Sequence, residues 1–323
     1  MNLKRYFTRK SFLAKAAGVA GGIMLPSILM KISGNYSDSA RNSAQLNAAL
    51  PANDRLVVVT GRNIAKPTIE KMAQKALAQF GGISQFVKKG MNVVIKPNIA
   101  WDAPPENAAN TNPDLVEYVA RICKEAGAKV TIFDRTCSSA RLSYKHSGAE
   151  DAAKKAGVKL EYIDERKFVD VKVPKGLNLE TLSVYKPILD ADFVINMPIA
   201  KHHSIAGLTI SMKNLMGVIG GNRGALHRNM DENLVDFVKA IRSDLVICDC
   251  LRILTNHGPN SGTAEDVKET RTIIVGRNPV SVDAYASTLF GKSPSTIKFL
   301  ALAHKEKMGE INPGKMNIQK FAV

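Results

Sequence analysis

Short apolar runs rich in β-branched residues alternate with helical patterns along residues 55–310, and this alternation constrains the fold more than any other feature. The strand candidates are Leu56–Val59, Asn92–Ile95, Val130–Phe133, Leu160–Ile163, Phe193–Ile195, Leu245–Cys248 and Thr272–Val275. The helix candidates are 67–80, 113–126, 147–156, 232–242, 280–290 and 294–306. Because continuous apolar strands suit a sheet covered on both faces, the pattern predicts an α/β fold with a mainly parallel sheet and helices on both faces.

Residues 55–310 are numerous enough to form a single α/β domain around one core. Within residues 166–190 the pattern changes to short strand-like runs, so we expect a small β excursion there, in the form of a hairpin. Residues 311–323 follow the last helical pattern and are expected to form a C-terminal tail.

Residues 1–32 have the three parts of an export signal: a basic start, an apolar stretch over 16–30 and a polar continuation. The apolar stretch is shorter than the ~20 residues that a membrane-spanning helix needs. The run Thr8–Lys15 resembles a twin-arginine signal in which Lys10 replaces the second arginine, and a general secretory signal is the alternative. Both predict passage through an export machinery to the periplasm, and a retained leader would tether the protein to the membrane. Residues 33–54 are expected to form a disordered tether.

Polar residues stand where four of the apolar runs end. Lys96 and Asn98 follow one run, Asp134 follows the next, and Asn196 and Asp249 follow two later ones. Ligands of open parallel sheets bind in the crevice beyond the carboxyl ends of the strands. Each residue alone could be a turn or cap residue, but together they predict a shared site.

The loops after the third and fourth of these runs contain further candidates. They are Lys201, His202, His203, Lys213, Asn214, Gly258 and Gly262. Lysine and asparagine would bind carboxylate or phosphate groups, and the glycines would let backbone approach a ligand closely. Asp134, Asp249 and one of the two histidines would transfer protons or hold a metal ion. Adjacent histidines on an extended chain face opposite ways, so we expect only one of them to serve.

The chain carries a formal net charge of +16, of which residues 1–50 contribute +6 and the remainder +10. A basic body attracts anions, although a solvated lysine surface is the simpler interpretation. Nucleic acid is not an expected partner, because aromatic residues are scarce and no basic block is interleaved with them. The four cysteines include no C-x-x-C pair, so the sequence has no iron–sulfur or zinc-ribbon motif. The cofactor stays open, with a metal ion as one alternative.

Several short motifs follow one another between about residues 55 and 290. They are Val94–Asn98, Ile195–Pro198, Lys201–His203, Ser211–Gly217, Gly258–Gly262 and Asn278–Ala284. This series resembles the family called domain of unknown function 362. The resemblance implies that Lys96, Asn98, Lys201, His203, Lys213, Asn214 and Asp249 are recurring motif positions, without giving their roles. Many members of that family carry an added ferredoxin-like segment, whose cysteines this chain lacks.

Two functions follow as hypotheses. The first is an exported protein that binds a small anionic ligand, or acts on one with metal assistance, in the crevice at the strand ends. The second is a non-enzymatic accessory or binding protein associated with an iron–sulfur or redox system.

Overall fold

The computed structural model describes residues 55–323. The predicted signal peptide 1–32 and tether 33–54 lie outside these residues. No helix in the described part of the chain is both long enough and apolar enough to cross a bilayer.

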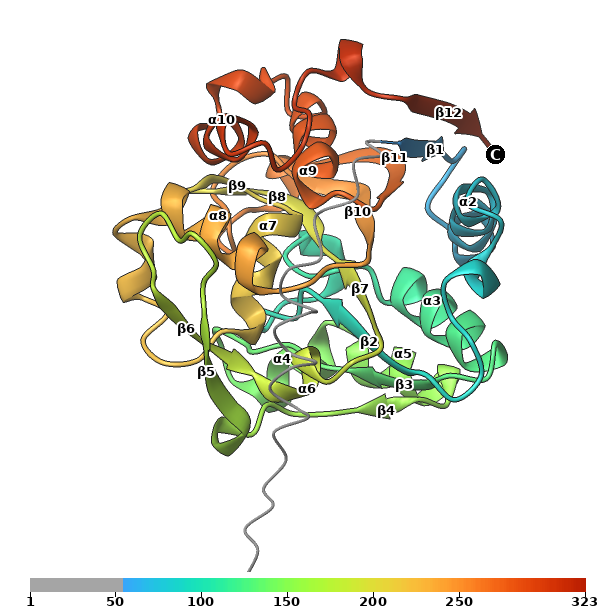
Figure 1. Cartoon of the computed structure of the whole chain (residues 1–323). Coiled ribbons are helices and arrows are strands. Elements are labelled where there is room, and N and C mark those ends of the chain that lie inside the picture. The colour runs from blue at the N-terminus through green and yellow to red at the C-terminus, as the bar shows by residue number, and fades with distance from the viewer. Residues whose placement is uncertain (1–54) are drawn as a thin grey trace, which may run out of the picture.

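A large twisted sheet forms the centre of the molecule, and its main path has the strand order β12-β1-β11-β10-β7-β2-β3-β4 (Figure 1). Its strands are β1 (Leu56–Thr60), β2 (Asn92–Pro97), β3 (Lys129–Ile132), β4 (Lys159–Leu160), β7 (Phe193–Met197), β10 (Leu245–Leu254), β11 (Val267–Gly276) and β12 (Ile318–Ala322). A side branch adds β8 (Ile199–His203), which pairs with β10, and β9 (Gly207–Thr209).

The sheet is mainly parallel, as predicted. The five successive strands β10, β7, β2, β3 and β4 pair in parallel with one another. Strand β11 is antiparallel to both β1 and β10. The expected C-terminal tail differs, because Ile318–Ala322 pairs in parallel with β1 as the edge strand β12 and so belongs to the sheet.

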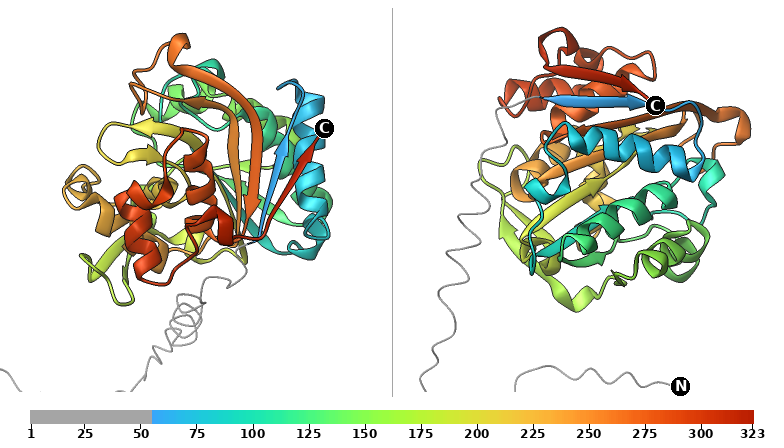
Figure 2. Two further views of the ribbon diagram at one scale, coloured as in Figure 1. Left: turned by 90° about the horizontal axis from the view of Figure 1, so that it is seen from above. Right: turned by 90° about the vertical axis from the view of Figure 1, so that its right-hand side faces the viewer.

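Helices cover both faces of this sheet (Figure 2). One face packs against α2 (Lys66–Ala78), α3 (Pro113–Glu125) and α5 (Ala149–Ala156), and the other against α8 (Met230–Ala240), α9 (Pro279–Thr288) and α10 (Lys298–Lys305). Alternate strand residues supply the two cores: Val57 and Val59 face the first set of helices, and Leu56 and Val58 face the second. This division confirms the predicted α/β fold with helices on both faces.

Local sequence signals define the helix that leads into the site. The side chain of Asn112 accepts hydrogen bonds from the backbone of Asp114 and Leu115 at the start of α3, and Pro113 occupies the first turn. Such a cap stabilises a helix by about 1 kcal/mol. The hairpin expected within 166–190 is also present, as β5 (Phe168–Lys172) and β6 (Thr181–Tyr185) paired antiparallel.

Strand β10 runs much further than predicted. The sequence suggested that it ends at Cys248, with Asp249 beyond the strand, whereas the strand continues through Asp249 to Leu254. The buried residues Leu251, Ile253 and Leu254 keep the extension within the core, and β11 pairs along most of its length. Asp249 is therefore a strand residue and lies apart from the crevice that it was expected to line.

Candidate functional site

The ends of β2, β3 and β7 bring the first site residues together. Lys96 is the penultimate residue of β2 and pairs in register with Asn196 of β7. Asp134 follows β3, which lies on the other side of β2. Because all three strands run parallel, their carboxyl ends meet at one edge, as the strand-end pattern predicted.

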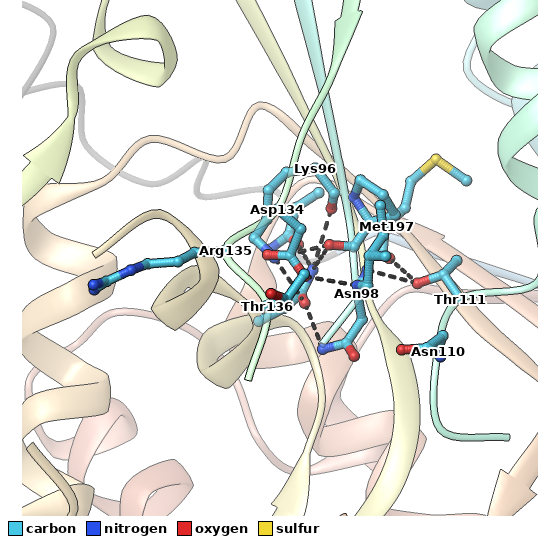
Figure 3. Close-up of polar contacts among 12 residues, drawn as sticks. Lys96, Asn98, Asn110, Thr111, Asp134, Arg135, Thr136 and Met197 are labelled. Carbon is cyan, nitrogen blue, oxygen red and sulfur yellow. Dashed lines mark hydrogen bonds and ion pairs between the residues drawn. The ribbon is translucent and has the colours of Figure 1, made fainter. Parts of the chain in front are cut away.

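Lys96 and Asp134 form a buried ion pair at this edge (Figure 3). Lys96 Nζ donates to Asp134 Oδ1 at 2.6 Å, and the backbone of Ile99 donates to Asp134 Oδ2 at 2.6 Å. Burial lowers the pKa of Lys96, and the Asp134 carboxylate opposes that shift. Both carboxylate oxygens are thus occupied within the protein, so Asp134 serves as the counter-ion of Lys96 in this arrangement.

Asn214 connects the strand ends through its side-chain amide. Its Oδ1 accepts from Lys96 Nζ and from Asn98 Nδ2, each at 3.0 Å. Its Nδ2 donates to Asn196 Oδ1 at 2.8 Å. Since both ends of the amide have partners in the protein, Asn214 holds Lys96 and Asn98 in place rather than offering free groups to a ligand.

Thr111 fixes the loop that follows β2. Its hydroxyl donates to the Met197 carbonyl at 2.7 Å and accepts from the backbone of Asn98 at 2.8 Å (Figure 3). The end of β2 is therefore tied to the end of β7 directly before α3 begins.

Gly217 makes room for the ion pair. A Cβ atom added there would lie 1.7 Å from Asp134 Oδ1 and 2.5 Å from Lys96 Nζ, closer than non-bonded atoms approach. The missing side chain of Gly217 thus leaves space for Lys96 and Asp134.

Lys201 lies on β8 and is 1 % exposed. Its Nζ donates to Asn98 Oδ1 at 3.2 Å and to the Ala109 carbonyl. Among the described residues no carboxylate forms an ion pair with it. Burial, together with the charges of Lys213 and Lys96, lowers the pKa of Lys201 to about 7.

Lys213 lies on α7 (Ser211–Asn214), which Asp283 of α9 anchors. The Asp283 carboxylate accepts from the backbone of Ser211 at 2.8 Å and of Met212 at 3.0 Å. Lys213 is 8 % exposed, and its Nζ contacts only Met216 Sδ, at 3.2 Å, among the described residues. Burial lowers the pKa of Lys213 to about 8.

These side chains line a cavity of about 320 Å³, a size that suits a small ligand. Seven predicted site residues line it: Lys96, Asn98, Asp134, Lys201, His203, Lys213 and Asn214. Its wall also includes Trp101, Arg135, Cys137, Thr209, Arg223, His227, Pro259 and Asn260.

His203 is held in one tautomer. Its Nδ1 accepts from the backbone of Ile205 at 3.1 Å and of Ala206 at 3.2 Å, which leaves the proton on Nε2. Burial and the charge of Lys213 lower the pKa of His203 to about 3. His203 is thus a neutral hydrogen-bond donor near pH 7, which does not suit the role of a proton-accepting base.

The other five predicted residues do not line the cavity. His202 Nδ1 accepts from the Gly258 backbone at 3.1 Å, on the opposite side of β8 from His203. Asp249 accepts from the backbone of Asn112 at 2.8 Å and thereby holds the start of α3. Cβ atoms at Gly258 and Gly262 would collide with the His202 carbonyl and with Leu254, so these glycines let the loop pack on the sheet. Asn196 is fully buried, and its Oδ1 accepts a hydrogen bond from Asn214 Nδ2.

Among the wall residues that the sequence did not predict, Arg223 and His227 come from the irregular segment before α8. Arg223 donates to the carbonyls of Arg135 and Thr136, which brings the loop after η4 (Leu215–Val218) against the loop after β3. His227 donates from Nδ1 to the Arg223 carbonyl at 3.1 Å and stacks on His203, with ring centroids 5.8 Å apart. The only sign of these residues in the sequence is the basic cluster of Arg223, His227 and Arg228. This cluster does not follow an apolar run, so the strand-end pattern did not include it.

The donor set does not match a metal site. Within residues 55–323, no three His, Cys, Asp or Glu side chains gather in an arrangement that could hold a metal ion. The cavity wall contains one carboxylate, Asp134, which already contacts Lys96.

Comparisons with known proteins agree with the residue pattern. Residues 93–288 match the family described as domain of unknown function DUF362, a span that includes the whole wall of the cavity. A thylakoid-associated protein of Synechocystis sp. is 30% identical over 247 residues, which cover 73% of this chain and 74% of that protein. The lactate racemase apoprotein from Thermoanaerobacterium thermosaccharolyticum is similar in structure, with a TM-score of 0.47, 13% identity, and coverage of 75% of this chain and 57% of that one. The chain belongs to the DUF362 family.

Proposed function

We propose that the protein binds a small anion, a carboxylate or a phosphate, in the cavity at the strand ends. The observation that carries this proposal is Lys213, whose ammonium is nine-tenths buried and has no oxygen acceptor among the described residues. Burying a charged group without a partner is costly. An anion in the cavity would supply the missing acceptor and the missing charge.

The charge of the cavity wall supports an anionic ligand. The wall includes Lys96, Lys213, Arg135 and Arg223 against the single carboxylate of Asp134. After Lys96 is paired with Asp134, the remaining cations exceed the acidic groups of the wall. A concave site lined by one sign of charge raises the local concentration of the opposite ion.

Two neutral donors would complete the coordination of such an anion. His203 lines the cavity and keeps its proton on Nε2. Thr209 lies opposite Lys201 in the β8–β9 hairpin, and its buried hydroxyl has no hydrogen-bond partner in the described chain. Hydrogen bonds to charged groups contribute about 1.5–3 kcal/mol each.

Calorimetric titration with inorganic phosphate and with acetate tests the proposal, using the wild-type protein and Lys213→Met. The substitution keeps the length and apolar stem of the side chain but removes the charge. Lys71→Met is the matched control, because Lys71 is exposed on α2 and lies outside the cavity wall. We expect the wild type and the control to bind equally and Lys213→Met to lose binding. Equal binding by all three proteins would refute the assignment.

We further propose that the protein works outside the cytoplasm, in the periplasm. The basic and apolar pattern of residues 1–32 supports export, and the relative in Synechocystis is described as thylakoid-associated. Cell fractionation and N-terminal sequencing of the recovered protein test this. A cleaved chain in the periplasmic fraction supports export, an intact chain in the membrane fraction supports a retained leader, and an intact chain in the cytoplasm contradicts both. Repeating the fractionation in cells that lack the twin-arginine machinery identifies the route.

A further inference from the structure

Lys201 differs from the other lysines of the cavity in how its amine is held. Lys96 contacts a carboxylate, a carbonyl and an amide oxygen, and Lys213 contacts only a sulfur atom. Lys201 has two neutral oxygen acceptors, Asn98 Oδ1 and the Ala109 carbonyl, and no ion-pair partner in the described residues.

Two acceptors match a neutral amine. An ammonium has three N–H groups to satisfy, whereas a neutral amine has two N–H groups and one lone pair. With both N–H groups donated to Asn98 and Ala109, the lone pair is the remaining position on the nitrogen. Because Lys201 belongs to the cavity wall, a ligand bound there would lie beside this side chain.

The surroundings of Lys201 also disfavour its charged form. The residue is 1 % exposed, and the nearby charges of Lys213 and Lys96 repel a further cation. These effects bring the pKa of Lys201 to about 7, so a substantial fraction of the molecules carries a neutral amine near pH 7. For an ordinary lysine the neutral fraction at that pH is on the order of 10³-fold smaller.

We propose that Lys201 forms an imine with the carbonyl carbon of a 2-oxo acid whose carboxylate occupies the anion site. The proposal rests on the proposed function, because the anion site beside Lys213 positions the substrate. In a 2-oxo acid the carbonyl carbon is bonded directly to the carboxylate carbon, so binding the carboxylate places the carbonyl next to the cationic wall. A buried lysine that is neutral near pH 7 is the form that serves as a nucleophile.

Imine formation needs only the Lys201 amine and the 2-oxo acid, and it releases one water molecule. The lone pair of Lys201 attacks the carbonyl carbon and forms a C–N bond, while the carbonyl π electrons move to oxygen. Both amine hydrogens then leave with that oxygen as one water molecule, and a C=N bond remains. No oxidant or reductant takes part.

Reductive trapping tests the proposal. The full-length protein is incubated at pH 7 with pyruvate and sodium cyanoborohydride, which adds two hydrogens across the imine and makes the link permanent. We expect one adduct per chain, with a mass equal to pyruvic acid less one oxygen atom, and peptide mapping should place it on Lys201. Acetone, a carbonyl without a carboxylate, should label Lys201 far more slowly.

Two variants separate the outcomes. Lys201→Met should give no adduct, whereas Lys71→Met should bind phosphate in calorimetry and label as the wild type does. Adducts spread equally over surface lysines would overturn the proposal. Phosphate binding without an adduct on Lys201 would overturn the imine and leave the anion site standing. If neither phosphate nor pyruvate binds and no adduct forms, both the imine and the anion site are wrong.

Discussion

Replacing Lys213 with methionine should make the protein more stable at neutral pH, because the native state holds this ammonium buried and without an oxygen partner. Burial lowers the pKa of Lys213 from 10.5 to about 8. One pKa unit corresponds to about 1.4 kcal/mol, so keeping Lys213 protonated in the folded state costs about 3 kcal/mol at pH 7. We expect Lys213→Met to raise the free energy of unfolding by about this amount.

The pH dependence of this difference has a definite sign. Between the folded pKa of about 8 and the ordinary value of 10.5, the unfolded chain binds more protons at Lys213 than the folded chain does. Stability of the wild type therefore rises with pH in this window. Below pH 8 the full cost is present, and above pH 10.5 it disappears. The advantage of Lys213→Met should thus shrink as pH rises from 8 to 10.5.

Urea unfolding followed by the fluorescence of Trp101, the single tryptophan, measures both effects. Lys71→Met serves as control and should change the free energy of unfolding by less than about 0.5 kcal/mol. Phosphate at about 100 times its dissociation constant should stabilise the wild type by about 2.7 kcal/mol and leave Lys213→Met unchanged. A variant that is less stable than the wild type at pH 7, or a difference that does not vary with pH, would refute the reasoning.

Three further predictions concern the residues around Lys213. Asp134→Asn should lower the free energy of unfolding by about 3–5 kcal/mol, because it leaves the Lys96 ammonium buried without its counter-charge. The double variant that also has Lys96→Met should have a higher free energy of unfolding than Asp134→Asn alone. Gly217→Ala should cost at least ~1–3 kcal/mol, since its Cβ would lie 1.7 Å from Asp134 Oδ1, whereas Gly224→Ala, with 3.2 Å to its nearest neighbour, should unfold as the wild type does. His203, whose pKa is lowered to about 3, should appear in nitrogen NMR as a neutral ring protonated on Nε2 at pH 5, and a charged ring at that pH would contradict the assignment.

Much of the fold could be predicted because local patterns and packing agree. Helix α3 begins at Pro113, the residue at which the helical pattern 113–126 predicted its start, and Asn112 caps it. The apolar runs of β1, β2 and β7 are buried strands because both faces of the sheet are covered. Strand β10 was predicted too short because Asp249 looked like a strand end. A buried carboxylate is tolerated there because the backbone of Asn112 and Leu251 donates to it.

The residues of the candidate site also fall into a group that the sequence predicted and a group that it did not. Lys96, Asn98 and Asp134 could be grouped from the sequence, because parallel strands place their carboxyl ends at one edge. Arg223 and His227 could not, because tertiary contacts between two irregular loops bring them to the cavity. The sequence also could not predict in which direction each of the adjacent histidines points. Only the structure shows that His203 faces the cavity while His202 contacts Gly258.

Diffraction from crystals soaked in selenate, an oxyanion with a strong anomalous signal, would show whether an anion binds beside Lys213. We expect a selenium peak in the cavity, with an oxygen atom within hydrogen-bond distance of Lys213 Nζ. Crystals of Lys213→Met should lose this peak. Peaks confined to surface lysines, with water alone beside Lys213, would contradict the claim that the buried ammonium is an anion site.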